Sequence, residues 1–375
     1  MLLFDAASLE YIRTKAAEGR LPNFSRVLEG GASLYLSTLR PTHPTPVWTA
    51  VATGMYPPKN GVRSAGRYQA WGAGHRVTLL PAYCLSHALV RLGLVREEPH
   101  TSGAWHARPL WSILSNAGVP SGIVRWPLTY PAGPVLGFTV SDRDDLFSAA
   151  QPPSGRHAVY PPEILADVRA VLEEDGDGGG DGTAVARSAA RDRRYARAAR
   201  SLIARHRPRV AALRFRAIDT AVHWHYEGAE SGTFRGNGAG RGRANAQEIE
   251  RAYADADAQV GEALGSLVPG DLLLVVSGFG MERLNPAKGL LARLLGDPVL
   301  PGGHDRAPDG FLLAYGRSIQ PGRLPPGSIV DVTPTVLYFA GVPIGRDMDG
   351  FARTDLFTAE FTAERPIAFI GSHNP

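Results

Sequence analysis

Five side chains in four short stretches of the chain could do chemistry. A hydroxyl becomes a nucleophile when a base or a metal activates it, and carboxylates and imidazoles are common ligands of divalent metals. Residues of these types are Asp5, Thr45, the pair Asp219 and His223, which lie four positions apart, and His304 in the segment GGHDRAPDG. Singly, each has an ordinary explanation as a turn, helix-cap, surface or loop residue. Their joint placement, each at the end of a predicted strand or the start of a predicted helix, favours a common site.

An alternation of apolar strands and helices must position these residues. The predicted strands are 2–5, 121–126, 209–215, 271–278 and 310–316, and the predicted helices are 23–31, 46–54, 108–118, 163–174, 187–206, 244–267 and 331–341. This pattern predicts an α/β fold with a mostly parallel central sheet sandwiched by helices. In such sheets ligands bind at the carboxyl ends of the strands. Asp5 and the loops after residues 215, 278 and 301 therefore lie where chemistry could occur.

The chain is expected to form one domain over residues 1–375, with insertions at about 63–107 and 127–200. The first insertion has few helix or strand signals, and the first part of the second is rich in proline and glycine. We expect both to act as lids over the functional edge of the sheet. Within the second, DGDGGGDG (175–182) is typical of a flexible surface linker.

Composition excludes several classes of protein. With 44% hydrophobic and 20% charged residues, the 375-residue chain can bury a large core. Its single cysteine, Cys84, excludes an internal disulfide framework and a cysteine-based metal site. The net charge is only +4, and no recognised motif predicts binding to a nucleic acid polymer. The sequence has no apolar run long enough for a transmembrane helix and no visible signal peptide, so we expect a cytoplasmic protein, unless an N-terminal extension is missing.

Several longer stretches resemble one known family. They include GRLPNFSRVLEGGA (19–32), PVWTAVATGMYPPKNGV (46–62), IDTAVHWHY (218–226), LLLVVSGFGM (272–281) and GSIVDVTPTVLYFAGVPIGRDMDG (327–350). Together they resemble the alkaline phosphatase superfamily, in its type I phosphodiesterase/nucleotide pyrophosphatase branch, over nearly the whole chain. The resemblance implies an alkaline-phosphatase-like α/β fold and a hydrolase that acts on phosphate esters.

The resemblance also implies a site with two divalent metals, usually zinc. One metal is held by an acid and two histidines, which correspond to Asp219, His223 and His304. The other is held by the first-strand acid, which corresponds to Asp5, by the nucleophile near Thr45, and by an Asp-His pair from an SDHG motif.

That last pair is missing here, because the sequence reads Ser277-Gly278-Phe279-Gly280. Neither glycine nor phenylalanine can bind a metal, and zinc normally needs three or four protein ligands. We therefore expect one divalent metal, zinc by resemblance, and a second site that is lost or weak, with the Phe279 ring in its place. Asp305 and His225 lie beside two ligands in the sequence and could orient them, or could be surface residues.

The nucleophile also departs from the family pattern. The family's hydroxyl residue usually lies four positions before the tryptophan, a place that Pro44 takes here, whereas Thr45 lies three before Trp48. A one-residue bulge would return Thr45 to the nucleophile position, with Thr42 as the second candidate. Three roles for Thr45 stay open. It is a working nucleophile, or water activated at the remaining metal attacks in its place, or it is only a helix cap.

Three functions stay open. The first is a metal-dependent hydrolase of phosphate mono- or diesters with a reduced site. The second is an enzyme on the same fold with altered phosphoryl- or sulfuryl-transfer chemistry. The third is a pseudoenzyme that binds a phosphorylated ligand or a protein partner. The expected substrate is a small phosphate ester or nucleotide-like molecule, with Trp126, Tyr130 and Trp105 as candidates either for stacking on its base or aryl group or for packing.

Overall fold

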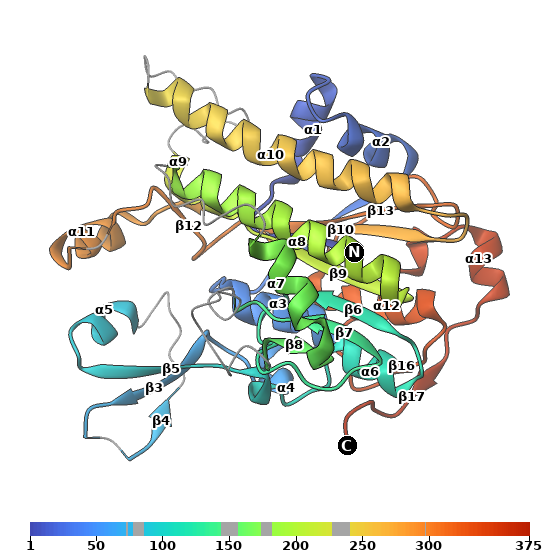
Figure 1. Cartoon of the computed structure of the whole chain (residues 1–375), viewed down its shortest axis with the longest axis horizontal. Helices are drawn as coiled ribbons and strands as arrows, with labels where there is room; N and C mark the ends of the chain where they lie inside the picture. Colours follow the sequence, from blue (N-terminus) through green and yellow to red (C-terminus); the bar gives the residue numbers. More distant parts are fainter. Residues whose placement is uncertain (73, 78–85, 144–156, 174–181, 227–240, 297) are drawn as a thin grey trace.

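A twisted sheet of ten strands crosses the molecule (Figure 1). The computed structural model describes residues 1–375 except 73, 78–85, 144–156, 174–181, 227–240 and 297. From one edge to the other, the strands are β14 (Gly322–Arg323), β2 (Ala32–Ser37), β13 (Asp309–Gly316), β10 (Leu272–Phe279), β1 (Leu2–Phe4), β9 (Val210–Phe215), β6 (Ser121–Val124), β7 (Gly137–Val140) and β8 (Val159–Tyr160), and β15 (Gly327–Ser328) pairs with β2.

The centre of this sheet is parallel, as the sequence predicts. Strand β1 lies between β10 and β9 and pairs in parallel with both, and β6 and β7 continue the same direction. Strand β13 is antiparallel to both of its neighbours, β10 and β2. The predicted fold class is confirmed, and β2 is a strand that the sequence analysis did not anticipate.

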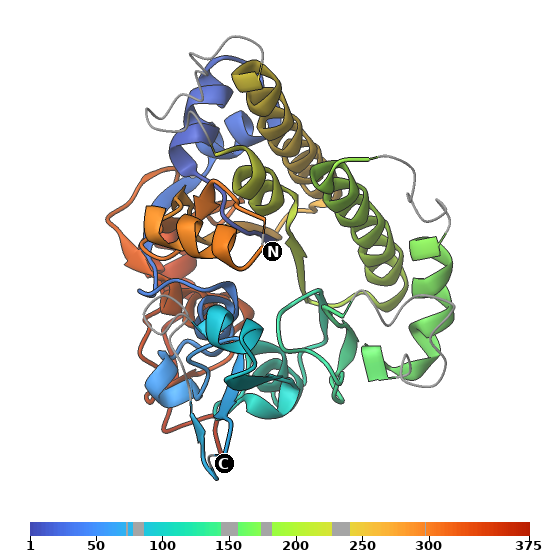
Figure 2. The same ribbon diagram turned by 90° about the vertical axis from the view of Figure 1, so that its left-hand side faces the viewer.

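Helices cover both faces of the sheet. Figure 2 shows two of them, α8 and α10, side by side. The helices of this layer are α1 (Leu9–Ala17), α2 (Pro22–Gly30), α8 (Ala184–His206), α9 (Ala217–His225) and α10 (Arg241–Ser266), and those of the opposite layer include α3 (Pro44–Thr53), α6 (Leu110–Asn116) and α12 (Val332–Ala340). The remaining elements are α4 (Pro57–Asn60), α7 (Leu165–Glu173), α11 (Pro286–Leu294), α13 (Ala359–Glu364), β11 (Glu282–Arg283), β12 (Gly302–Gly303), β16 (Ile344–Gly345) and β17 (Phe369–Ile370), with short 3-10 turns at Ser102–Ala104, Pro162–Ile164, Ile329–Asp331 and Thr354–Leu356. Among the described helices, none has the length and apolar character needed to cross a bilayer.

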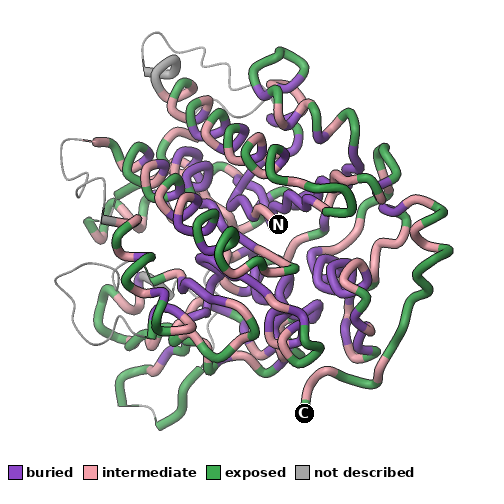
Figure 3. The backbone as a smooth tube through the Cα atoms, turned by 45° about the vertical axis from the view of Figure 1, so that its right-hand side comes forward, coloured by how far each residue is buried: buried purple, intermediate pink, exposed green. Residues whose placement is uncertain are grey.

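Burial is concentrated on the strands and on the inward faces of these helices (Figure 3). The largest wholly buried side chains include Trp48 on α3, Trp126 after β6, and Phe279 at the end of β10. The Trp48 ring packs edge-on against both of the others, with ring centres 5.9 Å and 6.4 Å away. Helix α3 is therefore fixed to the carboxyl edge of the sheet by an aromatic cluster.

The two expected insertions differ from each other. Within 63–107, β3 (Gly66–Ala70), β4 (Arg76–Val77) and β5 (Val95–Pro99) form a small separate sheet beside α5 (Ser86–Arg91). Within 127–200, by contrast, β7 and β8 extend the main sheet, and α8 packs on β6 and β9. The second segment is thus largely continuous with the main layers, and the role of the first as a lid stays a prediction. Most of the glycine-rich stretch 175–182 lies outside the described residues.

The start of α9 is held by a buried carboxylate on α8. Asp192 accepts hydrogen bonds from the backbone N–H groups of Arg216 and Ala217, both at 2.8 Å, and pairs with Arg125 Nη1 at 2.6 Å. Since the first N–H groups of a helix lack partners inside the helix, this carboxylate acts as a cap supplied from another element. It fixes the position and direction of the helix that carries Asp219 and His223.

Replacing Asp192 by Ala should therefore destabilise the protein strongly. The change removes the carboxylate that pairs with the buried Arg125 guanidinium and accepts from two helix N–H groups, which should lower the free energy of unfolding by about 3–5 kcal/mol. Asp167→Ala, which removes only the exposed ion pair with Arg205, should cost less than about 1 kcal/mol. Urea unfolding of both variants makes the comparison, and equal losses would contradict the role given to Asp192.

Candidate metal centre

Asp219, His223 and His304 converge at the carboxyl edge of the sheet. Asp219 lies in the first turn of α9 and His223 one turn later, while His304 directly follows β12. Their ligand atoms all lie within 4.8 Å of one another. His304 Nε2 is 2.9 Å from Asp219 Oδ1 and 3.0 Å from His223 Nε2. The convergence expected from the sequence is confirmed, and the binding of a metal there stays a prediction.

The hydrogen bonds of the two histidines suit a cation. His223 Nδ1 lies 2.9 Å from the carbonyl oxygen of Gly302, and His304 Nδ1 lies 3.1 Å from that of Gly280. A carbonyl can only accept, so both Nδ1 atoms carry the proton. In the neutral rings, both Nε2 lone pairs then point at one place beside a carboxylate, and a positive charge must lie between them. A proton or a divalent metal meets that need.

The supporting groups of the ligands are not the ones suggested by the sequence. Asp305 pairs with Lys288 Nζ at 2.6 Å, and His225 Nδ1 lies 3.0 Å from Asn245 Oδ1. Backbone carbonyls orient the two histidines instead. Both carbonyls belong to glycines, Gly302 and Gly280, and no side-chain pattern in the sequence predicts that these carbonyls contact the histidines.

Electrostatics couple the three ligands. Burial raises the pKa of the Asp219 carboxyl, but the hydrogen bond and charge of His304, with the charge of His223, outweigh it and hold that pKa at about 2. Burial lowers the pKa of His304, whereas the hydrogen bond and charge of Asp219 raise it, and the net result lies above the ordinary value. Without a metal, His304 therefore keeps its proton to a higher pH than an ordinary histidine.

Metal binding should release that proton. Because the pKa of His304 is raised, the protonated fraction in the metal-free protein is larger at about pH 6 than at about pH 8, and zinc must displace it. Zinc affinity should therefore increase over this range. Calorimetry at pH 6 in buffers with different ionisation enthalpies measures the released proton. His304→Ala should remove both this release and most of the affinity, and unchanged zinc affinity in that variant would contradict the site.

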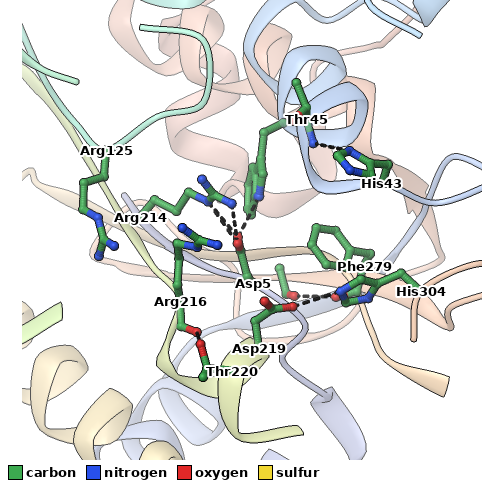
Figure 4. A network of polar contacts seen from close by, with 12 residues as sticks. Asp5, His43, Thr45, Arg125, Arg214, Arg216, Asp219, Thr220, Phe279 and His304 are labelled. Carbon is green, nitrogen blue, oxygen red and sulfur yellow. Dashed lines mark hydrogen bonds and ion pairs between the residues drawn. The ribbon is translucent and has the colours of Figure 1, made fainter. Parts of the chain in front are cut away.

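Asp5 is not brought into the metal group. Its carboxylate is 1% exposed and accepts hydrogen bonds from Arg214 Nε, at 2.9 and 3.1 Å, and from Trp48 Nε1, at 2.8 Å (Figure 4). Arg214 Nη2 also donates to it. The oxygens that would bind a second metal are thus occupied by a guanidinium and an indole.

The residues around Asp5 likewise do not fit a second metal. The wholly buried ring of Phe279 stands edge-on to His304, with ring centres 4.9 Å apart. A Cβ added at Gly278 would lie 2.5 Å from Val47 Cγ1. An aspartate at position 278 therefore requires the Val47 side chain to move.

Restoring the family motif alone should therefore fail. In the double variant Gly278→Asp, Phe279→His, the new carboxylate meets Val47 and is buried, which should lower stability by about 2 kcal/mol or more. Zinc content should remain at one ion per chain by elemental analysis. Adding Val47→Ala should recover part of the stability. Two zinc ions per chain in the double variant would show that the second site persists.

Thr45 lies in the first turn of α3, not at its cap. The sequence predicts a helix that begins at Pro46, whereas α3 begins at Pro44 and has His43 as its N-cap. The Thr45 N–H donates to His43 Nδ1 at 3.3 Å, and the Val47 N–H donates to the His43 carbonyl. With proline at two of the first three positions, this helix end has few free N–H groups for an anion.

The two candidate hydroxyls differ in their contacts. Thr42 is buried and donates to the carbonyl of Leu39 at 2.6 Å. The Thr45 hydroxyl has no hydrogen-bond partner within the described part of the chain. Of the two, Thr45 is the hydroxyl left available for another molecule.

His43 is a residue that the sequence analysis missed. Burial lowers its pKa to about 4, helped by the charges of His304 and Arg214, so the ring is neutral at physiological pH. The sequence feature that could have indicated it is its position among the prolines of RPTHPTP, residues 40–46. In Figure 4 it lies with Thr45 on α3, facing the side of the site that carries His304.

The three aromatic candidates for substrate stacking have different surroundings. Trp126 is wholly buried, and its Nε1 donates to the Trp48 carbonyl at 3.1 Å, so it packs in the core and cannot stack on a ligand here. Trp105 lines a cavity of about 400 Å³ beside Trp111. The ring of Tyr130 lies 5.2 Å from the guanidinium of Arg143.

Comparison with known proteins shows the family of the chain. Residues 1–298 match the family model described as type I phosphodiesterase/nucleotide pyrophosphatase, so the chain belongs to that family, as its resemblance implied. No curated protein matches the chain at a significant level.

Solved structures of one relative share the fold. Murine ectonucleotide pyrophosphatase/phosphodiesterase 5 has a TM-score of 0.55 at 12% identity, covering 96% of this chain and 100% of that one. The human counterpart has a TM-score of 0.57 at 11% identity, with the same coverage. A third structure, with a TM-score of 0.54 at 11% identity and 96% and 99% coverage, is an inactive threonine-to-alanine variant of the murine protein in complex with AMP.

Proposed function

We propose that this protein is a metal-dependent hydrolase of phosphate esters that works with one divalent ion. The observation that carries the proposal is the convergence of Asp219, His223 and His304, with both Nε2 atoms aimed at one place. Two imidazoles and one carboxylate, with a fourth position open, are a ligand set of catalytic zinc. An ion bound there supplies Lewis-acid polarisation of a phosphoryl oxygen.

Thr45 is the proposed nucleophile. Its hydroxyl is without a protein partner in the described structure, and it lies on the helix that Trp48 fixes to Asp5. Attack forms a bond between Oγ and phosphorus, and the ester oxygen leaves as an alcohol that carries the proton lost from the hydroxyl; water then cleaves the phosphothreonine, which restores the hydroxyl and releases the phosphate product. The positive end of the α3 dipole favours an anionic phosphoryl group there, although few backbone N–H groups are free to bind it.

The proposed substrate is a small phosphate ester, with a nucleotide-like diester as the first to test. Support comes from family membership and from the AMP complex of the murine relative, whose identity to this chain is only 11%. Trp105 and Tyr130 remain the aromatic groups proposed to meet a base or aryl group. Trp126 is excluded because it lies in the core.

The roles of Thr45 and His304 can be separated by hydrolysis of bis(p-nitrophenyl) phosphate. His304→Ala should abolish turnover with loss of zinc. Thr45→Ala should abolish turnover and the acid-trapped phosphothreonine while it retains zinc. Thr42→Ala is the matched control, since that hydroxyl is engaged with Leu39, and it should keep its rate per folded molecule.

Other results would redirect the proposal. Retained turnover in Thr45→Ala, with loss in His304→Ala, would make water the nucleophile. A parent protein that binds no divalent ion and hydrolyses no ester would instead be a pseudoenzyme that binds a phosphorylated ligand.

A further inference from the structure

An arginine is buried within the central sheet, beside the metal centre. Arg214 lies in β9, next to β1, and its side chain is 7% exposed. Burial lowers the pKa of the guanidinium, but the charge and hydrogen bonds of Asp5 raise it above its ordinary value, so the group stays charged. Burying a charge costs several kcal/mol unless it is well paired, so this position in an apolar strand calls for an explanation.

Among the described residues, the hydrogen bonds of this guanidinium all go to Asp5, and the charge of Asp142 also acts on it. Its Nε and Nη2 donate to the two oxygens of Asp5, and Trp48 Nε1 completes the partners of that carboxylate. In the described part of the chain, Arg214 Nη1 has no hydrogen-bond partner. The pair thus presents a fixed cationic donor with a free N–H group.

The Asp5–Arg214 ion pair lies beside the candidate metal ligands. The charge of Arg214 acts on His43, and that of Asp5 acts on His304. Figure 4 shows Asp5 between Arg214 on one side and Asp219 and His304 on the other. Arginine forks bind phosphoryl oxygens well because the guanidinium is planar, always charged and rich in donors.

We propose that Arg214, held by Asp5, is the second cation of this site, takes the place of a second metal ion, and binds an oxygen of the phosphoryl group through Nη1. The inference rests on the proposed function. It accounts both for the absence of a metal-binding pair at Gly278 and Phe279 and for the ion pair between Arg214 and Asp5. The shared ligand chemistry is a tetrahedral phosphoryl anion, either free phosphate or the group of an ester.

The competing explanation is that Arg214 only neutralises Asp5. The chain contains a second buried pair, Arg125 with Asp192, at 3% and 7% side-chain exposure, which supports the start of α9. That pair is a matched control for burial and charge. In Figure 4 the Arg125 side chain points away from Asp5.

The test uses two double variants that remove a whole ion pair, Asp5→Asn with Arg214→Met, and Arg125→Met with Asp192→Asn. Replacing both members avoids an unpaired buried charge, which is the main cause of misfolding in single variants. In the second variant the side-chain amide oxygen introduced at position 192 can still cap α9. Urea unfolding checks that both proteins fold, and elemental analysis gives the zinc content.

The readout is the binding of inorganic phosphate, measured by calorimetry with and without zinc. We expect one zinc ion per chain in the parent and in both variants. Phosphate affinity should fall about tenfold or more in the Asp5/Arg214 variant, with or without zinc, and stay unchanged in the Arg125/Asp192 variant. Arg214→Lys, which keeps the charge but not the fork, should bind phosphate with intermediate affinity.

Phosphate affinity equal to that of the parent in a folded Asp5/Arg214 variant would overturn the inference, as would two zinc ions per chain in the parent. Failure of the proposed function has a different signature, namely no zinc and no ester hydrolysis in the parent. The zinc-free titration still tests Arg214 in that case.

Discussion

The site depends on one buried carboxylate. Asp5 directly follows the central strand β1 and has almost no exposure to water, and a charge in that position requires compensation from its neighbours. Arg214 on the adjacent strand supplies the charge, and Trp48 on α3 supplies a further donor. The ion pair and the indole bond therefore join two strands and a helix at the carboxyl edge of the sheet.

The hydrogen bond from Trp48 to Asp5 holds α3 at this edge of the sheet, and α3 in turn positions other parts of the site. The Trp48 ring packs against Phe279, and Phe279 packs against His304. The same helix carries Thr45 near its N-terminus and places Val47 against Gly278. Loss of the metal-binding pair at 278 and 279 is thus one of several linked differences. An aromatic ring, a close helix contact and an arginine together occupy the region in which a second ion would have to bind.

The two sides of the site consequently differ in the source of their positive charge. On one side, three side chains converge on a point that needs a positive charge, with histidine rings fixed by backbone carbonyls. On the other, the positive charge belongs to the protein and cannot dissociate. Such an arrangement is preorganised, since the guanidinium is oriented before a phosphoryl group arrives. If Arg214 binds a phosphoryl oxygen as proposed, the site keeps two cationic elements with a single set of candidate metal ligands.

The sequence by itself determined the fold class, the family and the three residues that converge at the candidate metal centre. Apolar strands alternate with amphipathic helices by local rules, and Asp219 and His223 share a helix face because of their spacing. Motif comparison also showed that Gly278 and Phe279 cannot bind a metal. Tertiary structure alone decided what replaced them. The partners of Asp5 lie 209 and 43 residues away, the cap of α9 comes from α8, and the carbonyls that orient the histidines belong to glycines. The start of α3 at Pro44, the burial of Trp126 and the roles of His43 and Arg214 were missed for the same reason: contacts between residues far apart in the chain set burial and charge pairing, and no local pattern encodes them.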